Sequence, residues 1–396
     1  MVDAQPGQAA TGRGLNGPRP PPLGIYVHIP WCRRKCAYCD FNSYPGSTDL
    51  PEQAYVDALL RDLDQELPLV AGRRVGTLFI GGGTPSLLSG AAIQRRLDGI
   101  RARLELTTLA EITLEANPGS AEAARFQAYR DAGVNRLSLG VQTLEPAQLR
   151  ILERIHGPGE ARDALGLARR AGFTNINLDL MYGLPGQDLA SARRDLEQVL
   201  DWGPEHLSYY QLTLEAGTPF GLNPPLLPDE DLLDAIETQG KERLAGAGFR
   251  QYEVSAYARP GRACRHNLGY WSFADYLGLG AGAHGKLTLA DGRVQRRWKQ
   301  RRPNDYLGAA DQGHFLAGCQ TLDPDALVLE FMLNALRLKR GFSQRLFQTR
   351  TGLAPDRLAA GLELAQRRGL LEPHPRRVRP SPLGWRFLDD LMGLFA

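Results

Sequence analysis

Six short runs of strand-forming residues alternate with helical stretches from residue 23 to about residue 248, and this alternation constrains the fold more than any other feature. The runs are rich in Ile, Val, Leu and Tyr, and most end in Gly, Pro or Asn. We expect strands at 24–29, 77–80, 111–115, 136–141, 175–180 and 206–212. Helices are expected at about 55–67, 86–104, 120–133, 145–171, 188–201 and 229–247; the first has an apolar stripe of Tyr55, Leu59, Leu63 and Leu67. The pattern predicts parallel βα units, wound as an open sheet or closed towards a barrel.

The 396 residues divide into four regions. Residues 1–22 are rich in Gly, Ala, Gln and Pro, lack the apolar stretch of a signal peptide, and are expected to be a disordered tail. Residues 23–248 form the βα core, and residues 249–324 form an extension and linker with a dense group of His, aromatic and Arg residues. From 325 to 396 we expect helices at 325–338, 343–350, 355–367 and 383–394 around a hairpin at 369–382. This pattern predicts a small helical, winged-helix-like domain.

Polar and glycine residues lie at or near the C-terminal ends of four of the predicted strands. They are the run from Gly81 to Thr84, then Glu115, Gln142 and Asp179. A single polar residue at a strand end is often only part of a turn. Four such positions on successive strands predict an active site, because in parallel βα folds the carboxyl ends of the strands hold the chemistry.

Three of the five cysteines lie within eight residues, directly after the first strand. Cys32, Cys36 and Cys39 have the spacing C-x₃-C-x₂-C, which points to metal or redox chemistry in a reducing, cytoplasmic compartment. No further Cys or His follows at the spacing of a four-ligand zinc site. Three thiolates can instead hold a [4Fe–4S] cluster and leave one iron open. The basic residues 33–35 would favour thiolates. The alternative is three structural thiols on a surface loop.

The cysteine motif follows the segment from Tyr26 to Trp31, and Gly81-Gly82-Gly83-Thr84-Pro85 comes later in the chain. With these motifs the sequence resembles the radical S-adenosylmethionine enzymes, and among them the coproporphyrinogen dehydrogenase group. The resemblance implies a partial (β/α)₆ barrel, a [4Fe–4S] cluster on the three cysteines, and S-adenosylmethionine (SAM) cleaved by one electron from a reductant. The SAM-contacting positions it implies are Tyr26, Tyr38, Gly82, Gly83, Thr84, Glu115, Gln142, Arg154 and Asp179. Carboxylates suit the ribose hydroxyls and the ammonium group, and Arg154 suits the carboxylate.

This sequence departs from the pattern of the coproporphyrinogen dehydrogenases in two ways, and both favour a sister group. The dehydrogenases carry a fourth cysteine two residues after the third, where this chain has Phe41. They also have a long N-terminal segment before the first strand, which we do not expect here. Residues 266–271 read H-N-x-x-Y-W, a form associated with the HemW haem chaperone family. That resemblance implies haem binding near His266, Tyr270 and Trp271.

The role of His266 stays open at this point, since a lone histidine near aromatic residues is more often structural. An imidazole can ligate haem iron, and Tyr270 with Trp271 would supply an apolar wall. Cys264 is an alternative ligand, and His28 and His284 are weaker ones.

A net charge of +3 does not favour nucleic acid as a partner, and no apolar run is long enough to cross a membrane. The basic run at 293–302 is an ordinary solvated face, or it receives haem propionates, an acidic partner or anionic lipid at a membrane surface. A homodimer is also left open. Three functions therefore compete: a haem chaperone that delivers haem to an acceptor protein, a coproporphyrinogen III dehydrogenase, and another radical transferase such as a methylase or cyclopropanase. Phe41 and the H-N-x-x-Y-W segment favour the chaperone.

Overall fold

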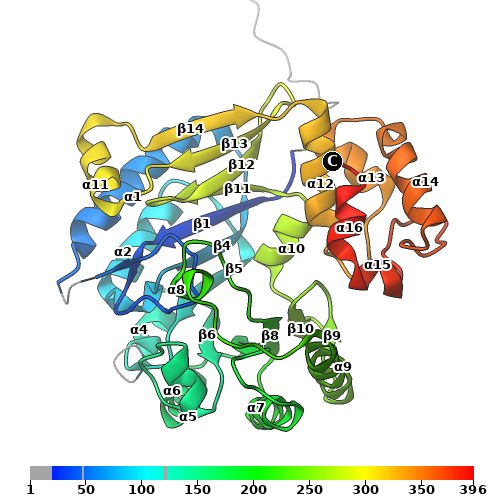
Figure 1. Cartoon of the computed structure of the whole chain (residues 1–396). Coiled ribbons are helices and arrows are strands. Elements are labelled where there is room, and N and C mark those ends of the chain that lie inside the picture. The colour runs from blue at the N-terminus through cyan, green and yellow to red at the C-terminus, as the bar shows by residue number, and fades with distance from the viewer. Residues whose placement is uncertain (1–19, 47–48, 120–122) are drawn as a thin grey trace, which may run out of the picture.

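A computed structural model describes residues 20–46, 49–119 and 123–396. Its centre is one twelve-stranded sheet with the order β14-β13-β12-β11-β1-β4-β5-β6-β7-β8-β10-β9 (Figure 1). The six predicted strands are all present and form its parallel middle: β1 (Leu23–Ile29), β4 (Val75–Gly82), β5 (Leu106–Ala116), β6 (Arg136–Gln142), β7 (Ile176–Tyr182) and β8 (His206–Gln211). The predicted α/β fold is confirmed, and among the described strands the sheet remains open because β14 and β9 are not paired.

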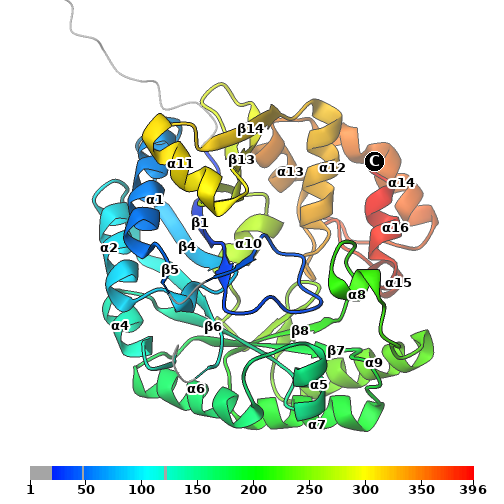
Figure 2. The same ribbon diagram turned by 60° about the vertical axis from the view of Figure 1, so that its left-hand side comes forward.

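Helices surround the outside of the curved sheet (Figure 2). They are α1 (Glu52–Glu66), α2 (Gly90–Arg101), α4 (Phe126–Asp131), α5 (Pro146–Ile151), α6 (Pro158–Arg170), α7 (Leu189–Asp201) and α9 (Glu230–Gly246). In α1 the residues Tyr55, Leu59 and Leu63 are buried, as their spacing predicts, while Leu67 begins a short 3-10 helix. The sheet and these helices share one apolar core.

The single helix predicted at 145–171 is wrong, since two helices occupy this segment. The chain leaves the helical conformation at Glu153, which has a φ of 57°, and α6 restarts with Pro158 in its first turn. Proline suits that position because the first turn has no helical partner for its missing N–H. Of the helix predicted at 120–133, residues 120–122 lie outside the described residues, and α4 is the α-helix of the remainder.

Eight further strands of the described residues were not predicted, and six of them extend the parallel middle into the twelve-stranded sheet. On one side β11 (Asp275–Leu279) pairs in parallel with β1, and β12 (His284–Thr288), β13 (Val294–Lys299) and β14 (Leu316–Thr321) follow antiparallel. On the other side are β10 (Ala256–Ala258) and β9 (Arg250–Gln251), and β2 (Trp31–Cys32) pairs separately with β3 (Tyr44–Pro45). Helix α11 (Pro303–Gln312) joins β13 to β14, and α8 (Pro219–Leu222) follows β8. The basic composition of β13 conceals the alternation that would have revealed a strand.

Helix α10 (Arg265–Trp271) crosses the inner side of the sheet and contacts β4 (Figure 2). Its position follows from Glu111, whose Oε1 accepts hydrogen bonds from the backbone N–H groups of Arg265 (2.9 Å) and His266 (3.2 Å). A carboxylate at a helix N-terminus satisfies N–H groups that have no partner within the helix.

The chain ends in a helical region with its own core, which also includes Phe273 and Val294. The helices are α12 (Pro324–Ala335), α13 (Gln344–Thr351), α14 (Ala359–Arg367), α15 (Pro382–Arg386) and α16 (Leu388–Gly393). An antiparallel bridge between Leu371 and Pro380 lies where the hairpin was predicted. The winged-helix description and the four region boundaries stay predictions. Residues 1–19 of the expected tail lie outside the described residues, while Pro21 and Pro22 accept hydrogen bonds from Arg73 and Asp275. No described helix is long and apolar enough to cross a membrane.

Candidate functional site

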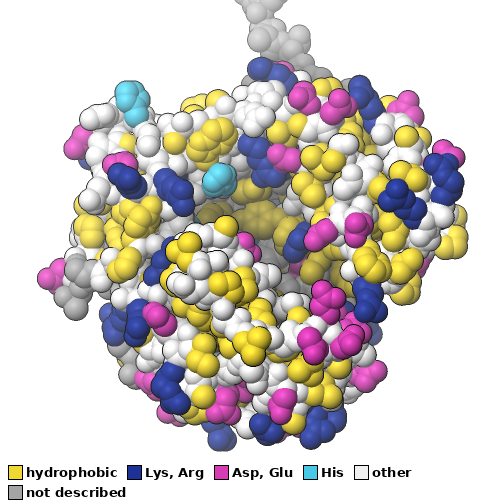
Figure 3. Space-filling view, in the orientation of Figure 1, with side chains coloured by type: hydrophobic (Ala, Val, Ile, Leu, Met, Phe, Trp, Pro, Cys, Tyr) yellow, Lys and Arg dark blue, Asp and Glu magenta, His cyan; other side chains and the backbone are white. Residues whose placement is uncertain are grey.

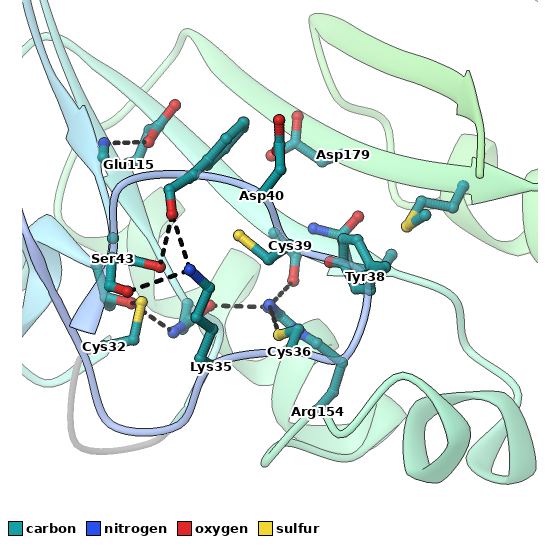
Figure 4. Close-up of a pocket in the computed structure, with 18 of the residues that line it drawn as sticks. Cys32, Lys35, Cys36, Tyr38, Cys39, Asp40, Ser43, Glu115, Arg154 and Asp179 are labelled. Atoms are coloured by element: carbon teal, nitrogen blue, oxygen red, sulfur yellow. Dashed lines mark hydrogen bonds between the residues drawn. The ribbon is translucent and has the colours of Figure 1, made fainter. Parts of the chain in front are cut away.

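A cavity of about 540 Å³ opens at the carboxyl ends of the parallel strands, below the cysteine loop. Figure 3 shows a hollow on this side of the molecule with apolar side chains in its depth. Figure 4 shows the loop, the carboxylates and Arg154 converging on the cavity. We call it the cluster cavity. It collects eleven of the twelve predicted cluster and SAM residues: Cys32, Cys36, Tyr38, Cys39, Gly82, Gly83, Thr84, Glu115, Gln142, Arg154 and Asp179.

The three cysteines are free thiols that line one wall of the cluster cavity. Cys32 is buried on β2, while Cys36 and Cys39 are partly exposed on the loop. Lys35 fastens this loop, because its Nζ donates to the backbone oxygens of Phe41 (2.9 Å) and Ser43 (3.2 Å). The loop is therefore held by its own hydrogen bonds, and it curves around the three cysteines (Figure 4).

The glycine turn after β4 brings backbone close to the cysteines. Gly83 and Thr84 donate their N–H groups to the carbonyls of Ile29 and Trp31, both at 2.7 Å. A Cβ on Gly83 would lie 2.5 Å from the Trp31 oxygen and 3.0 Å from the Cys32 sulfur. Only glycine permits this approach. The turn thus packs directly against the backbone of the segment that carries Cys32.

Two carboxylates line the cluster cavity, Glu115 next to the last residue of β5 and Asp179 in the middle of β7. Desolvation, with a smaller contribution from nearby Asp179, raises the pKa of Glu115 to about 8, although its Oε2 accepts the Gly82 N–H at 3.2 Å. Desolvation also raises the pKa of Asp179, opposed by its bonds to Asn177 (2.7 Å) and Ser138 (3.4 Å). Burial therefore favours the protonated form of both carboxyl groups, and a cation beside them would lower their pKa.

Arg34, Lys35 and Arg154 are the basic residues of the cluster cavity, and Arg154 is the one bonded to the residues at the strand ends. Its Nη2 donates to Asn117 Oδ1 (2.8 Å) and to the Gly140 carbonyl (2.6 Å), and its Nη1 lies 3.5 Å from the sulfur of Cys36. Its Nε is buried and has no partner among the described residues. An anionic group in the cavity would satisfy this donor.

Among the residues of the cluster cavity that sequence reasoning missed, two bond directly to predicted site residues. Asn117 donates from Nδ2 to Thr84 Oγ1 at 3.2 Å and so links the glycine turn to Arg154. Tyr210 donates to Gln142 Oε1 at 2.6 Å, while Gln142 itself has a φ of 69° at the end of β6. Both missed residues lie at strand ends, so the argument that found Glu115 and Asp179 could have found them too.

Tyr26 lies outside the cluster cavity and lines a second cavity of about 560 Å³. The two cavities share Asp40, Phe41, Gly82 and Glu115, so they adjoin. The other residues of the second cavity are His28, Asn42, Tyr270, Tyr276, Gly282, His284, Trp298, Lys299 and Arg301. Phe41 is 59% exposed at this junction.

The predicted haem segment lies on α10, away from the cysteines. His266 is buried, its Nδ1 pairs with Thr77 Oγ1 and its Nε2 with the Tyr270 hydroxyl, both at 2.8 Å. Desolvation, and secondarily Arg136, lowers its pKa to about 3. The Arg337 guanidinium lies over the ring of Trp271. The thiol of Cys264 is buried, and its Sγ lies 3.6 Å from Glu111 Oε1. In this arrangement both nitrogens of His266 are occupied, and only Tyr270 reaches the second cavity.

Most of the basic run at 293–302 is engaged in ion pairs. Lys299 contacts Asp62 (2.5 Å) and Glu66 (2.6 Å), and Arg297 contacts Glu66 at 3.1 Å. Arg296 pairs with Glu330, and Arg293 with Asp291. Arg301 and Arg302 have no carboxylate partner within the described part of the chain.

Comparison with known proteins first defines the class. Residues 26–199 match the radical SAM superfamily, and residues 322–387 match the HemN C-terminal domain. The solved structure of coproporphyrinogen III oxidase (HemN) from Escherichia coli has the same fold, with a TM-score of 0.80 and 25% identity over 95% of this chain and 90% of that one. The fold is therefore that of the radical SAM proteins.

Full-length relatives then define the family. The chain is 48% identical to "Heme chaperone HemW" of Escherichia coli (strain K12), covering 95% of this chain and 98% of that one. It is 42% identical to the protein of the same name from Haemophilus influenzae, and the match covers 96% of this chain and 99% of that one. A mitochondrial relative, radical S-adenosyl methionine domain-containing protein 1 of Bos taurus, is 36% identical over 95% of this chain and 81% of its own length. The chain belongs to the HemW family of the radical SAM superfamily.

Proposed function

We propose that this protein is a haem chaperone, which binds haem and passes it to a haem-requiring acceptor protein while holding a [4Fe–4S] cluster and SAM. The observation that carries the choice over the dehydrogenase is Phe41. It occupies the position where the dehydrogenases have a fourth cysteine, and its apolar ring is exposed between the two cavities. The names of the nearly full-length relatives point the same way.

The cysteine loop fits a cubane cluster. Among the described residues, no three Cys, His, Asp or Glu side chains converge on a single metal ion. In a cubane each thiolate binds a different iron, so the thiols need to surround the cluster rather than meet at one point. Cys32, Cys36 and Cys39 line the same cavity wall from one loop, and the fourth iron would face into the cavity.

The opposite wall fits SAM. The unpartnered Nε of Arg154 would take its carboxylate, and the glycine turn would take its amino group. Glu115 and Asp179 would face the positively charged and hydroxyl groups, and binding a cation would lower the raised pKa of each carboxyl group. When bound, the cluster and SAM supply one-electron chemistry, for which an external reductant is required.

The experiment is a side-by-side assay of the anaerobically reconstituted protein with haem and with coproporphyrinogen III. A chaperone should bind haem near one per chain, release it to apomyoglobin, and leave coproporphyrinogen III unchanged in the presence of SAM and reductant. Release of carbon dioxide and formation of protoporphyrinogen would replace this proposal with the dehydrogenase activity.

A further inference from the structure

We propose that the second cavity is the haem site and that the His284 imidazole is the axial ligand of the haem iron. The inference rests on the proposed function and adds the place and the ligand of the cargo. The cavity volume of about 560 Å³ lies within the range of ordinary small-molecule pockets.

His284 is the histidine of this cavity whose ring nitrogens are free. The other one, His28, is buried and uses both ring nitrogens, toward the Tyr26 hydroxyl and the Asn42 carbonyl, each at 2.9 Å. His266 is likewise fully bonded and does not line the cavity. His284 is exposed at the start of β12, and its ring has no hydrogen bond to any residue the structure describes. Neutral imidazole with an open nitrogen is a ligand for haem iron.

The neighbouring strands place this ring beside an aromatic partner. His284 lies directly opposite Trp298 on β13, and their rings are stacked with centroids 6.4 Å apart and planes 24° apart. Trp298 in turn lies opposite Gly318 on β14, where a Cβ would come within 2.3 Å of the indole. The indole therefore lies against Gly318, and its plane is nearly parallel to that of the neighbouring imidazole. An imidazole binds iron through a lone pair in its ring plane, which stacking leaves free.

The rest of the cavity matches the two chemical parts of haem. Phe41, Tyr270 and Tyr276 provide aromatic surface for the porphyrin. Arg301 on the same cavity has no carboxylate partner among the described residues and bonds only Asn42 through its Nε, at 3.3 Å. Its remaining guanidinium N–H groups can pair with a propionate. Lys299 cannot do so, because it is buried between Asp62 and Glu66.

The test compares ferric haem binding to the reconstituted wild type, His284→Ala and a matched control, His314→Ala. His314 is an exposed histidine just before β14 and lies outside the cavity. We expect His284→Ala to shift the Soret band, to release haem to apomyoglobin about tenfold faster or more, and to regain the band position when imidazole is added. Arg301→Gln should speed release without moving the band. Cluster iron is measured in each variant, and His284→Gln replaces the alanine variant if iron is lost.

The outcomes separate the two proposals. If the wild type binds no haem, the chaperone function itself is wrong. If the wild type binds haem while His284→Ala and His284→Gln keep its Soret band and its release rate, the function stands and the His284 site is wrong. A shifted band in His266→Ala but not in His284→Ala would likewise overturn the site and move the ligand to α10.

Discussion

Replacing Arg154 by leucine should weaken SAM binding by about 10- to 150-fold. The guanidinium is buried, and its Nε has no partner, so a ligand carboxylate would gain a charge-assisted hydrogen bond there. Such a bond contributes about 1.5–3 kcal/mol, and about 1.4 kcal/mol corresponds to a tenfold change in affinity. The substitution also leaves Asn117 Oδ1 and the Gly140 carbonyl without their donor, so the thermal midpoint should fall as well.

Equilibrium dialysis with labelled SAM, under argon and without reductant, measures this affinity while the cluster iron is quantified in parallel. Arg34→Leu is the matched control, since it removes the same charge from the same cavity. Among the residues that the structure describes, the Arg34 side chain pairs with Glu153 alone, with 58% and 40% of the two side chains exposed. Such exposed pairs contribute about 0–1 kcal/mol. Equal losses of affinity in both variants would show that general charge, and not the bond to Arg154, governs binding. Unchanged affinity in Arg154→Leu would refute the assignment.

Three further outcomes are expected. Cys36→Ala should abolish the air-sensitive absorbance and lower the iron content from about four per chain. Cys319→Ala, on an exposed strand, should leave both unchanged. A full iron content after loss of Cys36 would contradict the cluster assignment. Phe41→Cys should not confer decarboxylation of coproporphyrinogen III, measured as carbon dioxide release, and turnover by that variant would show that this one position separates the two activities. The folded-state pKa of His266 is about 3, below its unfolded value near 6.5, so stability is fully present above pH 6.5 and is lost as the pH falls. At pH 5 the loss is about 2 kcal/mol, and urea unfolding of His266→Gln at pH 7 and pH 5 should show a correspondingly weaker pH dependence.

The parallel middle of the sheet could be predicted because each of its strands is a short apolar run with clear punctuation. Because the carboxyl ends of parallel strands meet at one edge of a sheet, Glu115, Gln142 and Asp179 could then be predicted to share a site, although they are far apart in the sequence. The spacing of Cys32, Cys36 and Cys39 was enough to predict that they share a site. These inferences succeed because the repeat of apolar residues, the Gly, Pro or Asn that ends a strand, and the spacing of cysteines are all local properties of the chain.

The second cavity could not be predicted, because it depends on strands that the sequence conceals. In β13, Arg296, Arg297 and Lys299 are paired with carboxylates from other elements, so charge there does not mark a solvated face. Without β12 and β13, nothing places His284 beside Trp298 or near the cysteine loop. Long-range pairing decides these contacts, and a single sequence does not reveal it.

At the proposed haem site, the H-N-x-x-Y-W segment would influence haem binding without ligating the iron. His266 is held between Thr77 on β4 and the Tyr270 hydroxyl, and its ring stacks on Phe79 at 5.2 Å. Tyr270 in turn packs against Tyr276, with the two ring centroids 4.5 Å apart, and both residues line the second cavity. Removing the imidazole would free Tyr270 and loosen the aromatic wall beneath a porphyrin. Faster haem release in a His266 variant therefore does not identify a ligand; a shift of the Soret band that added imidazole reverses does.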